Sequence, residues 1–178
     1  DVLVGGGDDD ELTGNGGADV LLGAIGDDVL TVSDLAFRRV DGGSGVDVLR
    51  LAGDGLALDD ELLTSTRIAG IEVIDLGTTG SNSLTLSRAA GASLLADSDH
   101  TVTVDGQRRA LVIRGDADDT VTLDGGWVFA GSVERDGLRS DHFVLDGMVV
   151  EISEDVTVTD RNLTTIDVRH LHGLLTLT

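Results

Sequence analysis

The sequence predicts an all-β protein: a right-handed parallel β-solenoid with about 18 residues per coil, one short helix and an antiparallel β cap at the C-terminal end. Three observations support this fold class. Glycine-rich units of nine residues recur at the start of the chain. Glycine makes up 25 of the 178 residues, whereas proline and cysteine are absent. Only one tryptophan and three phenylalanines are present, so the core must be a thin stack of aliphatic side chains.

The charge balance excludes several classes of protein. The chain has 33 acidic and 12 basic residues and a formal net charge of −21, so we expect no nucleic-acid partner. Its hydrophobic content of 40% is enough for a core, which argues against disorder. No apolar run approaches the roughly 18 residues of a membrane span, so we expect no membrane span. The lack of cysteine rules out disulfides and thiolate zinc sites.

The repeats follow the pattern G-G-x-G-x-D-x-U-x, where U is a large aliphatic residue. The last unit, GGSGVDVLR, fits every fixed position, and each of the other three departs from it once, at Asp8, Asn15 or Ala24. In each unit a glycine-rich turn precedes a three-residue strand with one inward aliphatic side chain. The four units are Gly5–Thr13, Gly14–Leu22, Gly23–Thr31 and, after a short interruption, Gly42–Arg50.

This tandem pattern resembles the RTX nonapeptide family, whose repeats form a calcium-binding parallel β-roll in bacterial proteins exported by type I secretion. A longer stretch, from Asp28 to Trp127, is similar to segments near the C-terminal ends of large bacterial surface proteins and adhesins with RTX repeats. The resemblance implies a secreted or cell-surface location and a structural or adhesive parent protein.

The spacing of the acidic residues predicts where calcium binds. Two units make one coil, and stacked coils lie about 4.8 Å apart, so carboxylates and turn carbonyls of successive coils converge. Calcium takes six to eight such oxygens. We expect about three ions, between Asp1 and Asp19, between Asp10 and Asp28, and between Asp28 and Asp47. The series of Asp1 and Asp19 should end where Phe37 and Arg38 replace the next acid. The predicted calcium ligands are Asp1, Gly5, Gly7, Asp8, Asp9, Asp10, Gly14, Gly16, Asp19, Gly23, Asp27, Asp28, Gly42 and Asp47.

The chain is expected to divide into three parts. Residues 1–50 form the calcium-binding roll, and residues 51–125 continue the parallel solenoid, with a short helix near 59–67 that Asp59 caps. Residues 126–178 form an antiparallel cap, because Asp146-Gly147 between two apolar runs is a strong hairpin signal and a solenoid end must be covered. The bulky aromatic residues Trp127, Phe129 and Phe143 are grouped in this last part.

In the middle part, we expect Asn82, His100 and Asp119 to continue the series of Asp47, and residues 71–76 and 93–95 to be strands on the opposite side. The acidic turns at 96–100 and 115–119 have two readings that the sequence leaves open, a further calcium site or a solvated acidic face.

Catalytic patterns are absent: there is no G-x-S-x-G, no H-E-x-x-H, no P-loop and no Rossmann fingerprint, so we expect no enzyme. The leading hypothesis is a calcium-binding structural module that folds on calcium binding outside the cell. The alternative is a carbohydrate-binding accessory module of a secreted polysaccharide-acting protein, with the arginine pairs 38–39 and 108–109 as contacts. Salt bridges to nearby Asp are the other reading of these pairs. The expected partners are calcium ions, and surface glycans or neighbouring modules of the same long chain.

Overall fold

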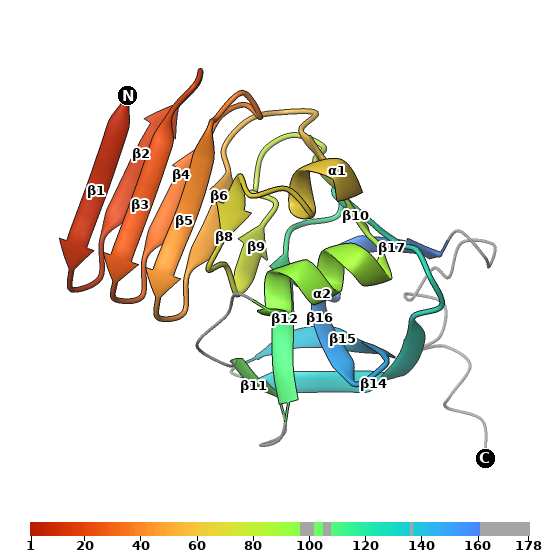
Figure 1. The fold of residues 1–178 in the computed structure, drawn as a ribbon. Coiled ribbons are helices and arrows are strands. Elements are labelled where there is room, and N and C mark those ends of the chain that lie inside the picture. The colour runs from red at the N-terminus through yellow and green to blue at the C-terminus, as the bar shows by residue number, and fades with distance from the viewer. Residues whose placement is uncertain (97–101, 105–107, 136, 161–178) are drawn as a thin grey trace, which may run out of the picture.

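The computed structural model describes residues 1–96, 102–104, 108–135 and 137–160. The protein is mostly β, as predicted, and the described residues contain two helices. Figure 1 shows the N-terminal strands as a stack of ribbons, with the helices and the antiparallel strands toward the other end. Neither helix has the length and apolarity that crossing a membrane would require.

The first part of the chain alternates between two parallel sheets. Sheet A receives every second strand and sheet B the strands between them, and one strand of each makes a unit here called a coil. In sheet A, Val2 lies opposite Val20, and Val20 lies opposite Arg39, one coil further along the chain. Sheet A is β1 (Val2–Gly7), β3 (Val20–Ile25), β5 (Arg39–Ser44) and β8 (Ile68–Ala69). The parallel part of sheet B is β2 (Glu11–Asn15), β4 (Val29–Val32), β6 (Val48–Leu51), β9 (Val73–Asp75), β12 (Arg108–Arg114) and β16 (Met148–Ser153).

The core between sheets A and B is thin and aliphatic. Leu21 and Val40 point inward from sheet A and Leu30 and Leu49 from sheet B, and all four are fully buried. Because the strands are short, each contributes only a few such side chains, and Val32 and Leu51 extend the buried rows of β4 and β6.

A third parallel sheet, sheet C, replaces sheet A in the second part of the chain, and it corrects the sequence-based assignment. Residues 71–76 were expected opposite the acidic series, but β9 pairs with β6 and lies in sheet B. Asn82 and Asp119 precede strands of sheet C instead. The interval of 18 residues also fails here. Asn82 N donates directly to Asp119 Oδ1, so two neighbouring positions of the series are 37 residues apart. Sheet C is β7 (Ala57–Leu58), β10 (Ser83–Leu86), β13 (Thr120–Leu123) and β17 (Thr157–Asp160).

Both helices begin with a side-chain cap. Helix α1 (Asp60–Leu63) is shorter than the predicted range, but Asp59 caps it as predicted, with its Oδ1 accepting from Leu62 N at 2.9 Å. Helix α2 (Arg88–Ala96) shows that the prediction of a strand at 93–95 is wrong. Ser87 Oγ accepts from Ala90 N at the start of α2, so an alanine-rich run after a serine favours the helix.

The C-terminal part forms the predicted meander but is not a separate antiparallel cap. Strands β14 (Val128–Arg135), β15 (Leu138–Leu145) and β16 pair antiparallel, and the Asp146-Gly147 turn has φ of 50° and 86°. However, β16 also pairs parallel with β12, and β17 pairs parallel with β13, so the parallel sheets continue past residue 125. The remaining strand, β11 (Val102–Val104), pairs antiparallel with β12. His100 and residues 161–178 lie outside the described residues.

Candidate metal centre

A column of carboxylates runs along the turns that enter sheet B. Asp10 N donates to Asp28 Oδ1 at 2.8 Å, and Asp28 N donates to Asp47 Oδ1 at 2.8 Å. The column continues to Glu72, whose Oε2 accepts from Asp47 N at 2.9 Å. Each side chain therefore fastens its own coil to the preceding coil through one oxygen.

The second oxygen of each aspartate in this column is buried without a hydrogen-bond partner. The atoms are Asp10 Oδ2, Asp28 Oδ2 and Asp47 Oδ2, and Asp28 and Asp47 have no exposed surface. A buried carboxylate oxygen without a donor is costly, and native proteins compensate such atoms with a donor, a water or an ion.

Backbone carbonyls face these unpartnered oxygens across a glycine. A Cβ placed on Gly23 would lie 2.3 Å from Asp28 Oδ2 and 2.4 Å from Gly42 O, and one on Gly5 would lie 2.6 Å from Asp10 Oδ2 and 2.9 Å from Gly23 O. An ion could not occupy the position of such a Cβ, because that position is too close to Cα. The distances nevertheless show where oxygens of two successive coils converge. Only glycine leaves this space free. We call each such group of a glycine, a carboxylate oxygen and a carbonyl of the next coil a cell.

The two cells fit calcium by the chemistry of their donors. Calcium binds carboxylate and backbone carbonyl oxygens at about 2.3–2.6 Å in flexible geometry. The residues that would hold the ions are Asp10 with Gly23, and Asp28 with Gly42, between the coils where the sequence predicts two of its ions. No group of three or more Asp, Glu or His side chains suited to a metal occurs in the described part of the chain. A cell built from one carboxylate and main-chain carbonyls has no need of such a group.

Burial and the neighbouring charges perturb the carboxylate column. Desolvation raises the pKa of Asp47 to about 7, although Asp28 N donates to its carboxylate, and the charges of Glu72, Asp28 and Asp27 add to the rise. Without a cation, Asp47 therefore keeps its proton up to about pH 7, whereas an aspartic acid in water loses it near 3.8.

The second predicted series has a different environment. The α-amino group of Asp1 donates to Asp19 Oδ1 at 2.6 Å. This contact repeats the hydrogen bond between successive coils of the first column, in which a side-chain oxygen accepts from a main-chain nitrogen. We call such a hydrogen bond a rung. The nearest atom to a Cβ on Gly14 would be Leu21 Cδ1 at 3.0 Å, ahead of Asp19 Oδ2 at 3.3 Å. No carbonyl is among the three nearest atoms to that point, in contrast to the two cells of the first column. As predicted, the acidic series ends after Asp19, because the position opposite it is Arg38.

The structure also places the other predicted ligands of the turns. At the outer edge, Asp27 N donates to Asp9 Oδ1 and Val46 N donates to Asp27 Oδ1, both at 2.8 Å, which forms a second hydrogen-bonded column. Asp8 O lies against Gly26, and a Cβ on Gly7 would meet nothing within 4 Å. Gly16 lies against Asp34, whose Oδ2 would be 2.7 Å from its Cβ.

In sheet C the same rung is closed by an amide. Asn82 Oδ1 accepts from Leu56 N at 2.8 Å, and its Nδ2 donates to Leu76 O at 2.7 Å and Gly53 O at 3.0 Å. Asn82 is 1% exposed. The amide therefore supplies donors to two carbonyls at the position where Asp28 leaves an unpartnered oxygen, so this rung needs no ion.

The acidic turn at 115–119 also uses both carboxylate oxygens for hydrogen bonds. Asp119 Oδ1 accepts from Asn82 N and its Oδ2 from Asp116 N, each at 2.9 Å. Burial raises the pKa of Asp119. Val156 Cγ2 would lie 3.0 Å from a Cβ on Gly115, where the cells of the first column have a carbonyl. These contacts favour a structural turn over a metal site.

Glu72 is the residue of the column that the repeat pattern did not reveal. It lies 25 residues after Asp47, because β7 and α1 are inserted in that coil, so a search at intervals of 18 or 19 passes over it. The usable signal is local: an acid precedes Val and an aliphatic residue in Asp28-Val-Leu, Asp47-Val-Leu and Glu72-Val-Ile alike.

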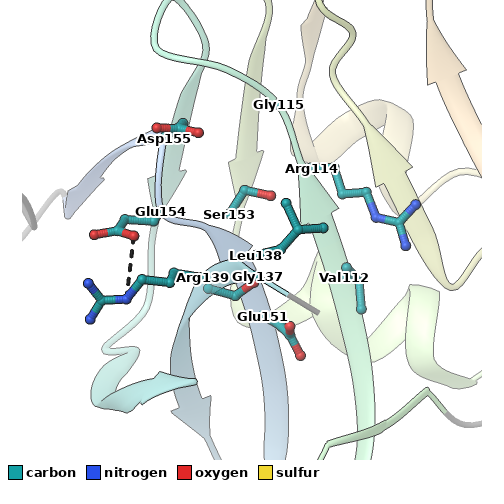
Figure 2. A pocket seen from close by; sticks show the side chains of 11 residues that line it. Val112, Arg114, Gly115, Gly137, Leu138, Arg139, Glu151, Ser153, Glu154 and Asp155 are labelled. Atoms are coloured by element: carbon teal, nitrogen blue, oxygen red, sulfur yellow. Dashed lines mark ion pairs between the residues drawn. The ribbon is translucent and has the colours of Figure 1, made fainter. Parts of the chain in front are cut away.

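Elsewhere, a pocket of about 550 Å³ lies beside β12 and β16. Figure 2 shows the ion pair of Arg139 and Glu154 within its lining, 3.6 Å apart, and Arg114 extending toward the opposite side. Sugar-binding sites typically use exposed aromatic rings, and none of the residues lining this pocket is aromatic. Of the arginine pairs, Arg39 forms a salt bridge with Asp41 at 2.7 Å.

Comparisons of the chain with protein-family models, with curated proteins and with solved structures gave no match.

Proposed function

We propose that this protein is a non-enzymatic, calcium-binding structural module whose residues 1–51 form a β-roll that folds on calcium binding. The observation that carries the proposal is the repeated cell: a buried carboxylate oxygen without a partner, opposite a main-chain carbonyl of the next coil, with a glycine between them. Parallel pairing of β1, β3 and β5, and of β2, β4 and β6, supports the roll, because it stacks these cells along one edge.

The energetics of the ion-free roll support coupling between metal and folding. The formal net charge of −21 makes the chain repel itself, and Asp10, Asp28 and Asp47 each add a carboxylate oxygen that is buried without a hydrogen-bond partner. A calcium ion bound in a cell would neutralise charge and connect two coils, so its binding free energy would become folding free energy.

The location of the module is proposed from the family resemblance. In proteins with RTX repeats the chain passes through a type I secretion system and meets calcium outside the cell. We propose the same setting for this chain, as part of a secreted or surface protein that takes calcium as its principal ligand. Secretion before folding agrees with a roll that is unstable without the ion.

The test is circular dichroism with thermal melting of the whole chain at rising calcium, in chelator and with magnesium. We expect a cooperative gain of β signal and a higher Tm with calcium. Magnesium should have little effect, because it demands octahedral geometry at about 2.0–2.1 Å. Equal stability in chelator and in calcium would contradict the proposal.

A pair of glycine variants tests the cells themselves. Gly23→Ala puts a Cβ 2.3 Å from Asp28 Oδ2 and 2.4 Å from Gly42 O, so it should abolish most of the stabilisation by calcium. Gly7→Ala is the matched control, since its Cβ meets nothing within 4 Å and the Gly7 carbonyl is kept. Similar calcium responses of the two variants would rule out the cells as the binding sites.

A further inference from the structure

The turn after the last glycine repeat is similar to the cells, because a carbonyl of the next coil again lies beside a glycine and an aspartate side chain. A Cβ on Gly42 would lie 2.1 Å from Gly70 O and 2.5 Å from Asp47 Cγ. Sheet pairing explains the match: Asp41 lies opposite Ala69, so Gly70 stands to Gly42 as Gly42 stands to Gly23. Gly70 belongs to none of the nonapeptide units.

The charge at this junction exceeds that of a repeat turn. Asp47 has no exposed surface and its Oδ2 has no hydrogen-bond partner, while Glu72, 2% exposed, extends its carboxylate to Asp47 N. Asp47 thus lies between the Gly70 carbonyl, across Gly42, and the carboxylate of Glu72.

We infer that Asp47, Glu72 and the Gly70 carbonyl form a further calcium site, which joins the roll to the rest of the chain. The inference rests on the proposed calcium-binding function and extends it to residues outside the repeats. The donors are all oxygens, carboxylate and carbonyl, which calcium prefers over softer metals. An ion here would hold the turn 42–47 against the turn 70–72 and so close the segment that contains α1.

The column ends at this site. The next position of sheet B, one coil beyond Glu72, is Leu111, because Val112 lies opposite Val73 and donates to Glu72 O. Leu111 is fully buried in the apolar core, and its side chain has no carboxylate oxygen for a further cell. The junction is therefore the last cell of the column.

Equilibrium dialysis of the whole chain against calcium, with bound ions counted per chain, tests this site. We expect Glu72→Gln to bind one ion fewer than the wild-type protein. Asp75→Asn is the matched control, because it removes the same charge three residues further along the chain, at a side chain that pairs with Arg50. It should bind as many ions as the wild type.

Each result has a defined meaning. The junction site would be overturned if Glu72→Gln bound as many ions as the wild type. The proposed function would stay intact in that case, provided that the wild type binds calcium and Gly23→Ala loses its response to calcium. Absence of calcium binding by the wild type would overturn both. If Glu72→Gln does not fold in calcium, as judged by its β signal, the dialysis is carried out with Asp47→Asn instead. An asparagine at this position keeps the acceptor for Asp28 N. An ion count equal to the wild type in that variant would also overturn the site.

Discussion

Asp28 and Asn82 differ by one atom in the side chain and illustrate two ways to complete the same rung. Each accepts a main-chain N–H through Oδ1 at 2.8 Å. The second atom of Asn82 donates to two carbonyls, whereas the second oxygen of Asp28 has no donor. The side chain of Asn82 is therefore satisfied within the protein, whereas the second oxygen of Asp28 still needs a donor, a water or an ion.

Exchanging the two side chains should exchange their behaviour. Asp28→Asn should raise the ion-free stability by about 1–3 kcal/mol, since it removes a buried unsatisfied charge, and should weaken the response to calcium. Asn82→Asp should lower the ion-free stability by a similar amount. Thermal and urea unfolding in chelator measures both. A loss of ion-free stability in Asp28→Asn would contradict this explanation.

The titration of Asp47 predicts the pH dependence of the ion-free protein. Its pKa is about 7 in the folded chain and near 3.8 when unfolded, so the folded state binds the extra proton between these values. Stability in chelator should therefore fall as the pH rises from about 4 to 7 and then level off. Calcium must displace this proton, so calcium affinity should increase over the same interval.

Urea unfolding at pH 5 and pH 8 in calcium-free buffer measures this dependence, with Asp47→Asn as the control. The variant should lose most of the decrease. A protein that becomes more stable in chelator as the pH rises from 5 to 8 would contradict the assignment.

At the scale of the elements, regular spacing decided what could be predicted. The rungs Asp10, Asp28 and Asp47 follow from intervals of 18 and 19, because short strands between tight turns leave little freedom in register. Where a helix is inserted, the interval becomes 25 and the next rung is hidden.

The same limit explains the error in the second part of the chain. Residues 93–95 can form a strand or a turn of helix, and only the serine cap and the packing against the core decide for α2. A Cβ placed on Gly91 of this helix would lie 3.1 Å from the ring of Trp127. No local sequence pattern encodes this contact. The assignment of β9 and β10 to sheets B and C depends on such long-range packing.

On the scale of the whole molecule, sheet B connects two regions with different needs. In the described part of the chain, the buried aspartate oxygens without a hydrogen-bond partner belong to Asp10, Asp28 and Asp47, and the rungs of sheet C at Asn82 and Asp119 are satisfied within the protein. Figure 1 shows these regions as the stacked strands and the body that contains both helices. We expect residues 52–160 to keep their fold when calcium is removed.

Trp127 reports on the second region alone. Its ring is 5% exposed and its Nε1 donates to Leu86 O at 3.2 Å. Removing calcium should change the far-ultraviolet circular dichroism while the tryptophan emission stays that of a buried ring. Trypsin in chelator should cut first after Arg38, Arg39 and Arg50. A red shift of the emission with the same calcium midpoint as the dichroism would show instead that the whole molecule unfolds as one unit.

The stacking of short coils has a mechanical consequence under the proposed function. A folded coil of 18 residues adds about 4.8 Å to the length of the stack, the distance between neighbouring strands. The same residues as an extended chain span up to about 60 Å, at roughly 3.3–3.6 Å per residue. Each coil released by loss of its ion would therefore lengthen a tethered chain more than tenfold along the stack, so the calcium concentration would set the reach of whatever the module carries.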